Sequence, residues 1–222
     1  LEKLALVDAG NISSPDDDET KSIVELGALA KKSSLVIALG GDNSITYTGA
    51  KATDATGLIT LDAHYDLRDG VSNGSPVCRL IEAGLSGKKV VQIGIADFSN
   101  STEYAKRAKD YGITVIPRSQ LRTKSIEEIW AAALSVAGDK VFVDFDMDVC
   151  DRSVVPACPA AAPGGISADE LRQFAFLAGA SRSVIGADIT EIDSAKDSED
   201  ERTVRLAALA ILEMIAGFST RS

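Results

Sequence analysis

Acidic side chains and the only histidine of the chain gather in two short segments, residues 62–66 (Asp-Ala-His-Tyr-Asp) and 144–148 (Asp-Phe-Asp-Met-Asp). Alternate residues of an extended strand point to the same face, so the acidic and histidine side chains of each segment are predicted to share a face. Carboxylates crowded together out of water repel one another and need compensation. A divalent cation supplies it, and oxygen ligands with one imidazole favour an ion such as Mn²⁺ or Mg²⁺.

The composition excludes several classes of protein. The 222 residues include one histidine, which rules out classical zinc fingers and zinc sites built from several histidines. The chain has 33 acidic residues against 23 Lys and Arg, a net charge of −10. This acid excess argues against a nucleic-acid partner or an anionic membrane surface, since both need basic patches.

Cysteine usage and hydropathy favour a cytoplasmic protein. Cys78, Cys150 and Cys158 form no C-x-x-C pair, so neither a disulfide framework nor a thiolate metal site is expected. The chain opens without a charged and apolar leader, and its apolar runs fall short of the roughly 20 residues that a membrane span needs.

Short apolar runs rich in β-branched residues alternate with helical patterns, which is typical of βαβ units and a mostly parallel sheet. Strands are predicted at about 35–40, 57–62, 89–95, 113–116, 140–147 and 184–190. Capping-box patterns at Ser22, Ser125 and Ser167, each with Glu three residues later, predict helix starts. Residues 201–216 predict a last helix, apolar on most faces, that packs deeply or meets another subunit.

Polar residues follow four of these strands, at Gly40–Asn43, in the two acidic segments and at Glu191. The carboxyl ends of parallel strands meet at one edge of a sheet, where ligands bind. A lone aspartate there is usually a cap or turn residue. Several acids together with the only histidine instead predict one shared metal site.

The chain resembles the ureohydrolase family of arginases, agmatinases and formimidoylglutamases. The matching segments are GGDNS (40–44), LDAHYDLR (61–68), NGSP (73–76), DFDMDVCD (144–151), PGGIS (163–167) and ADITEID (187–193). The resemblance implies an α/β fold, a three-layer αβα sandwich with a mostly parallel sheet, in one domain over residues 1–222. It also implies a homo-oligomer, trimer or hexamer, and a natural N-terminal segment that is partly missing here.

Family enzymes hold two Mn²⁺ ions bridged by a hydroxide that attacks an amidine or guanidine carbon. By resemblance, Asp62 and Asp146 are the bridging carboxylates, and His64 and Asp148 are further ligands of one ion. Asp66 and Asn43 are assigned to the other ion. Asn43 stands where the family has histidine, and an amide oxygen is a poorer donor for Mn²⁺, so weaker occupancy is expected there.

The resemblance also assigns roles toward a substrate. Asp148 orients the hydroxide and accepts its proton, and Glu191 pairs with the cationic amidine or guanidine. Asn73 replaces a second usual histidine; it cannot titrate but can orient substrate through hydrogen bonds. Arg68 and Arg79 are candidates to clamp a substrate carboxylate, and the alternative for each is a surface salt bridge.

An arginine clamp favours an acidic substrate, and the motifs resemble the formimidoylglutamase branch most closely. The expected reaction is hydrolysis of N-formimidoyl-L-glutamate to L-glutamate and formamide, a step of histidine degradation. One alternative is an agmatinase- or arginase-like enzyme that releases urea from a guanidino compound. Another is a catalytically inactive homologue, suggested by the asparagines at both usual histidine positions.

Overall fold

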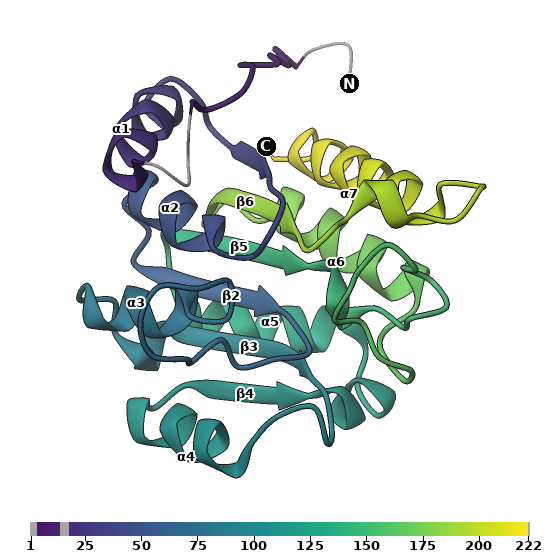
Figure 1. Ribbon diagram of the computed structural model, residues 1–222. Helices are drawn as coiled ribbons and strands as arrows, with labels where there is room; N and C mark the ends of the chain where they lie inside the picture. The colour runs from purple at the N-terminus through teal and green to yellow at the C-terminus, as the bar shows by residue number, and fades with distance from the viewer. Residues whose placement is uncertain (1–3, 14–17, 222) are drawn as a thin grey trace.

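The computed structural model describes residues 4–13 and 18–221, and within them the strands form one parallel sheet (Figure 1). The strand order is β1-β6-β5-β2-β3-β4. The strands are β1 (Val36–Leu39), β2 (Gly57–Leu61), β3 (Val90–Ile95), β4 (Thr114–Pro117), β5 (Val141–Asp146) and β6 (Val184–Thr190). All six predicted strands are confirmed, and β2, β3 and β5 are buried throughout, as continuous apolar runs indicate.

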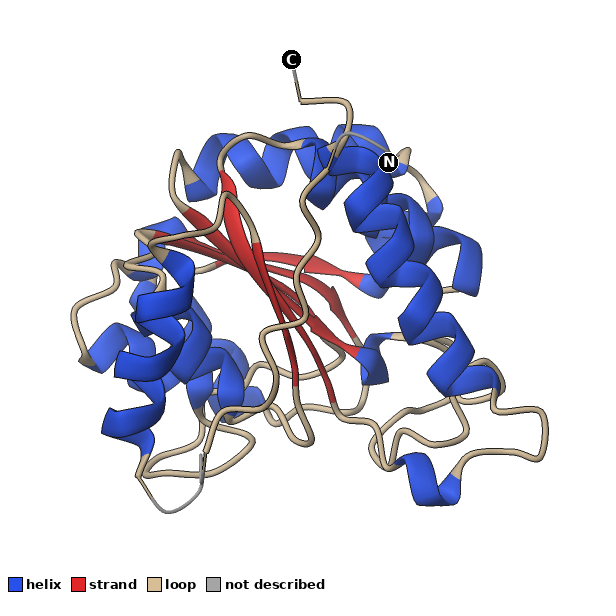
Figure 2. Ribbon diagram, turned by 90° about the horizontal axis from the view of Figure 1, so that it is seen from above, coloured by secondary structure: helices blue, strands red, loops and turns tan. Residues whose placement is uncertain are grey.

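Helices cover both faces of the sheet (Figure 2). One layer contains α1 (Glu19–Ala30), α2 (Ile45–Ala52), α3 (Pro76–Glu82) and α4 (Thr102–Tyr111), and the other contains α5 (Ile126–Ala137), α6 (Ala168–Ala180) and α7 (Arg202–Phe218). This confirms the three-layer αβα sandwich. No helix in the described part of the chain combines the length and the apolar character needed to cross a membrane.

Each layer packs through its own apolar cluster. The larger cluster joins the sheet to α5, α6 and α7, and within it Trp130 meets Phe174 edge to face at 6.3 Å between ring centroids. The smaller cluster lies under α2, α3 and α4 and includes Leu58 and Phe142. A Cβ atom on Gly49 would lie 2.4 Å from the Phe142 ring, so glycine lets α2 approach the sheet closely.

The last helix docks as predicted, with Leu206, Ala210 and Met214 buried in the core of its own layer. Val204 and Leu212 remain exposed on its outer side.

Two of the three predicted capping boxes are present. Ser125 and Ser167 each exchange hydrogen bonds with the glutamate three residues later. The prediction for Ser22 is wrong, because α1 begins at Glu19 with Asp18 as its N-cap. Ser22 is buried inside the helix, where its hydroxyl donates to the Asp18 carbonyl at 3.1 Å. An aspartate one turn earlier caps equally well and lets the helix start sooner.

Candidate metal centre

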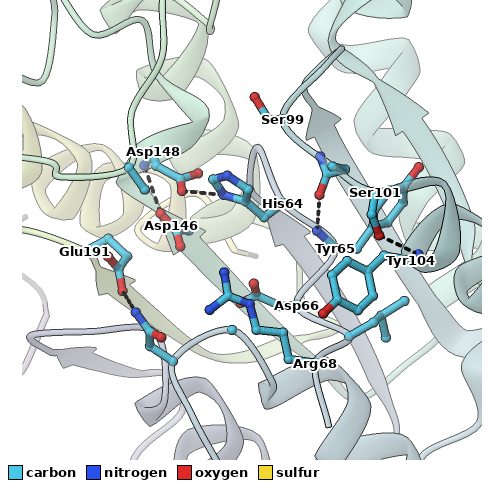
Figure 3. A pocket seen from close by; sticks show the side chains of 15 residues that line it. His64, Tyr65, Asp66, Arg68, Ser99, Ser101, Tyr104, Asp146, Asp148 and Glu191 are labelled. Atoms are coloured by element: carbon cyan, nitrogen blue, oxygen red, sulfur yellow. Dashed lines mark hydrogen bonds and ion pairs between the residues drawn. The ribbon is translucent and has the colours of Figure 1, made fainter.

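The site lies at the carboxyl edge of the sheet, where β2 and β5 are neighbours. The chain leaves β2 toward β3 and leaves β5 toward β6, on opposite sides, so the two following loops separate and open a crevice. A pocket of about 150 Å³ occupies it, which suits a small molecule rather than a polymer (Figure 3). Its walls are His64, Tyr65, Asp66, Leu67, Arg68, Asn73, Gly74, Ser99, Asn100, Ser101, Tyr104, Asp146, Asp148, Ala160 and Glu191.

The acidic residues converge for a different local reason from the one predicted. Strand β2 ends at Leu61, so residues 62–66 form a loop, and Asp148 belongs to a short 3-10 turn, Met147–Val149. Strand alternation therefore explains neither His64 nor Asp148. Asp66 points into the pocket because its backbone is left-handed, with φ of 50°.

Asp144 is also placed differently from the prediction. It obeys strand alternation with Asp146 but lies one step deeper, fully buried between Thr60 of β2 and Asp188 of β6. It is therefore part of the interior and not of the pocket wall.

Two groups of side chains offer donor atoms within 4.8 Å of one another. The first comprises Asp62, His64 and Asp148, and the second comprises Asp62, Asp66 and Asp146. Asp62 belongs to both and is completely buried, and its Oδ2 atom has no hydrogen-bond partner among the described residues. A buried carboxylate oxygen left unpaired is costly, so the residues present fit a bound divalent cation.

Backbone amides hold one oxygen of each central carboxylate. Asp62 Oδ1 accepts from the His64 amide at 2.6 Å, and Asp146 Oδ1 accepts from the Asp148 amide at 2.8 Å. Asp148 Oδ1 accepts from the Ala63 amide at 3.0 Å. The second oxygens of Asp62 and Asp146 stay free of the backbone, whereas Asp148 Oδ2 faces the His64 imidazole.

The pKa values show how strongly the site resists accumulating negative charge. Burial, followed by repulsion from Asp66, raises the pKa of Asp62 well above its usual value. Burial raises the pKa of Asp66 to about 7. The pKa of His64 is raised by Asp148, whose Oδ2 lies 2.7 Å from His64 Nδ1. The site therefore favours either protons or cations.

Asn43 lies beside this cluster, but its oxygen does not face it. Its Nδ2 donates to Asp66 Oδ2 at 2.6 Å, while its Oδ1 accepts from the hydroxyls of Thr46 at 2.8 Å and Thr190 at 3.0 Å. The amide oxygen, which the assignment of Asn43 as a metal ligand requires, is thus directed away from the cluster. Because two hydroxyls donate to the amide oxygen, the amide nitrogen is the group presented to Asp66.

Glu191 and Asn73 meet at the pocket as predicted. Glu191 directly follows β6 with φ of 63°, and its amide donates to the Gly41 carbonyl at 2.7 Å. Its Oε1 accepts from the Asn43 amide at 3.0 Å and from Asn73 Nδ2 at 3.5 Å. Burial raises the pKa of Glu191.

The two candidate arginines lie in different places, and only one of them lines the pocket. Arg68 extends into the pocket on the side of Asp66 (Figure 3), and within the described residues it makes no ion pair. A Cβ atom on Gly74 would lie 2.8 Å from the Arg68 side chain, so glycine makes room for it.

Arg79 instead lies on α3 outside the pocket walls. It binds both oxygens of Glu19, at 2.9 and 2.5 Å, and lies 3.8 Å from the centroid of the Tyr47 ring. The salt-bridge alternative is the correct one for Arg79.

The loop after β3 and the first turn of α4 contribute four pocket residues that the sequence patterns did not single out, namely Ser99, Asn100, Ser101 and Tyr104. The signal was present, because small polar residues follow the strand predicted at 89–95 just as they follow its neighbours. The carboxyl-end rule applies to this strand too.

Comparison with known proteins decides the family, because the model of the arginase family matches residues 1–217. The chain belongs to the arginase family. Its formimidoylglutamase relative from Halalkalibacterium halodurans is 39% identical over 84% of this chain and 62% of the relative. That of Bacillus subtilis is 37% identical over 81% of this chain and 60% of the relative.

The arginase of Medicago truncatula is more distant, at 29% identity over 82% of this chain and 55% of the relative. The predicted similarity to the formimidoylglutamase branch is therefore confirmed. This arginase-family chain spans about three fifths of the length of the two formimidoylglutamases.

Solved structures agree in fold. The crystal structure of formimidoylglutamase from Bacillus subtilis has a TM-score of 0.88 at 31% identity and covers 95% of this chain and 70% of that one. The crystal structure of Trypanosoma cruzi formiminoglutamase with Mn²⁺ has a TM-score of 0.89 at 26% identity and covers 97% of this chain and 76% of that one.

Proposed function

We propose that this chain is a Mn²⁺-dependent hydrolase of linear amidines that converts N-formimidoyl-L-glutamate and water to L-glutamate and formamide. The observation that carries the proposal is one pocket that joins two carboxylate groups sharing Asp62 to the guanidinium of Arg68. The first part suits a pair of divalent ions and the second suits a substrate carboxylate. Similarity to two formimidoylglutamases supports the same reaction.

The ligands available to the ions are Asp62, His64, Asp66, Asp146 and Asp148. Carboxylate oxygens with a single imidazole suit Mn²⁺ better than a thiophilic metal. Bound divalent ions lower the pKa of a water molecule enough to make it a nucleophile near neutral pH. The formiminoglutamase of Trypanosoma cruzi was solved with Mn²⁺, which supports the choice of ion.

The protein itself supplies proton transfer and orientation. Asp148, whose Oδ1 accepts from the Ala63 amide, orients the attacking water and accepts its proton. Glu191 pairs with the cationic amidine, because a carboxylate accepts two parallel N–H bonds from such a group. Asn73, in contact with Glu191, orients the same end of the substrate.

Arg68 recognises the other end of the substrate. Its guanidinium lines the pocket without an ion-pair partner in the described part of the chain, and its planar donors match a carboxylate. Agmatine has no carboxylate to offer this group. Arg68 is therefore the feature that favours an acidic amidine over agmatine.

The test is a product assay on the purified Mn²⁺-loaded protein. Formamide release from N-formimidoyl-L-glutamate is expected. His64→Ala should abolish this activity. Gln173→Ala, which alters a side chain on α6 outside the pocket walls, should leave it unchanged. Urea from arginine or agmatine would instead establish the ureohydrolase alternative. Absence of both products from metal-loaded protein would establish the inactive homologue.

We further propose a cytoplasmic homo-oligomer, a trimer or hexamer. Three free, buried cysteines suit a reducing compartment. Val204 and Leu212, exposed on α7, offer apolar area for a subunit contact. Light scattering after size-exclusion chromatography tests the assembly, and a monomer at micromolar concentration would contradict it.

A further inference from the structure

We infer that Asn100 is a positioning residue that holds the metal-binding loop, residues 62–66, in the shape that directs His64 and Asp66 into the site. The inference rests on the metal centre of the proposed function. Asn100 belongs to the loop after β3 and is neither acidic nor a member of either group of donor atoms. Its role therefore lies in the bonds it makes to the neighbouring loop.

Those bonds lie on either side of His64. Asn100 Nδ2 donates to the Ala63 carbonyl at 2.8 Å, and Asn100 Oδ1 accepts from the Tyr65 amide at 3.2 Å. The second of these is the dashed line that reaches Tyr65 in Figure 3. One planar amide thus fixes the residue before His64 and the residue after it.

Asn100 is anchored to the start of its own loop as well. Its Nδ2 also lies 3.4 Å from the Ala96 carbonyl, while the Ala96 amide donates to the Ala63 carbonyl at 3.0 Å. The loop after β3 and the metal-binding loop are therefore joined at several points, so a shift of one requires a shift of the other.

A second buried amide completes the support. Gln92 of β3 is fully buried, and its Nε2 donates to the Tyr65 carbonyl at 2.9 Å. Both backbone polar groups of Tyr65 are thus bound by side-chain amides, in a segment that has no strand or helix of its own. The sequence neighbour of Tyr65 is Asp66, with φ of 50°, a conformation that persists only when its surroundings impose it.

An asparagine suits this place for a chemical reason. The two loop contacts need one donor and one acceptor on the same short planar group. An aspartate would offer two acceptors and would add charge to a site already crowded with carboxylates. A neutral amide therefore orders the metal ligands without competing for the metal.

The experiment compares wild type, Asn100→Ala and Gln173→Ala by calorimetric titration of metal-free protein with Mn²⁺. Partners that orient metal ligands typically change metal affinity by about 10- to 100-fold when removed. Asn100→Ala is expected to weaken Mn²⁺ binding by that factor, while Gln173→Ala, which loses a surface amide bonded to Asp169, binds as wild type does.

Co²⁺ supplies a readout that a merely structural role would not change. The visible absorption of bound Co²⁺ depends on ligand geometry, so Asn100→Ala is expected to shift the bands, and kcat should fall while KM stays unchanged. If Asn100→Ala binds both ions with wild-type affinity and a wild-type spectrum, the inference is wrong, even if the protein melts at a lower temperature.

Asn100→Asp keeps the inference testable if the alanine variant does not fold. Its carboxylate still accepts from the Tyr65 amide but faces the Ala63 carbonyl without a donor, so weaker Mn²⁺ binding is again expected. Wild-type affinity in this variant would overturn the inference. Failure of the wild-type protein to bind either ion would contradict the proposed metal centre itself, and the inference with it.

Discussion

The two halves of the metal centre share Asp62 but differ in the nitrogen-bearing side chain beside them. In the histidine half, formed by Asp62, His64 and Asp148, an imidazole nitrogen lies 2.7 Å from a carboxylate oxygen and is itself a possible ligand. In the asparagine half, formed by Asp62, Asp66 and Asp146, the neighbouring Asn43 donates an N–H bond to Asp66. One half therefore offers an ion mixed donors, and the other offers carboxylates alone.

The halves also differ in burial. The His64 side chain is 29% exposed, whereas Asn43 and Asp66 are buried. Burial raises the pKa of Asp66 to about 7, against the lowering effect of the Asn43 hydrogen bond, so this half holds a proton readily. The asparagine half is therefore expected to depend more strongly on pH and on metal concentration than the histidine half.

Loss of the shared carboxylate should erase the difference between the halves. Asp62→Ala is expected to release both ions and to lower the rate of hydrolysis by roughly 10³-fold, in the range for loss of electrostatic stabilisation in an active site. Metal analysis after dialysis measures the first effect. Asp66→Ala is the comparison and should keep one ion, in the histidine half; one ion retained by Asp62→Ala would show that Asp62 is not shared.

Asn43→His should make the halves more alike. An imidazole directed at Asp66 adds a nitrogen donor, which Mn²⁺ prefers to an amide. The association constant of the weaker Mn²⁺ site should therefore rise roughly tenfold, which corresponds to about 1.4 kcal/mol of binding free energy. Calorimetric titration resolves the two binding steps. Thr46→Ser, which keeps a hydroxyl bonded to Asn43, is the control; an unchanged weaker step in Asn43→His would mean that Asn43 does not limit binding.

The pH dependence of stability should separate metal-free from metal-loaded protein. The pKa of Asp66 is about 7 in the folded protein against an ordinary 3.8, so the folded state binds more protons between these values and the free energy of unfolding falls as pH rises from about 4 to 7. Mn²⁺ should cancel the loss by pairing with the ionised carboxylates. Melting temperatures at pH 5 and pH 8 check this, and a metal-free protein that is equally stable at both would contradict it.

Arg68 tests whether the substrate tail lies on the side of the asparagine half. Arg68→Ala is expected to raise KM for the acidic amidine about tenfold with little change in kcat, because the lost contact is the same in substrate and transition state. Arg79→Ala is the matched control: its pair with Glu19 lies outside the pocket and is partly exposed, so KM should not change. An equal change of KM in both variants would show that Arg68 does not bind the substrate carboxylate.

Much of the fold followed from sequence patterns, and the candidate metal-ligand set followed from those patterns together with the family resemblance. Apolar runs predicted the strands, and polar residues at their carboxyl ends predicted one shared site, because parallel strands end at the same edge. The details that failed depend on local competition. Asp18, and not Ser22, is the N-cap of α1. Strand β2, along which side chains alternate between faces, ends at Leu61, one residue before the first candidate metal ligand.

Residue types and their order therefore determined the family, the parallel sheet and the carboxylates with His64 that meet at its edge. Tertiary structure alone decided the direction of each side chain. Arg79 pairs with Glu19, whereas Arg68 lines the pocket. The Thr190 hydroxyl, which is distant along the chain, binds the Asn43 oxygen and helps to keep it away from Asp66. Patterns along the chain record which groups are near in sequence, whereas hydrogen bonds are satisfied by whichever partners folding brings within about 3 Å.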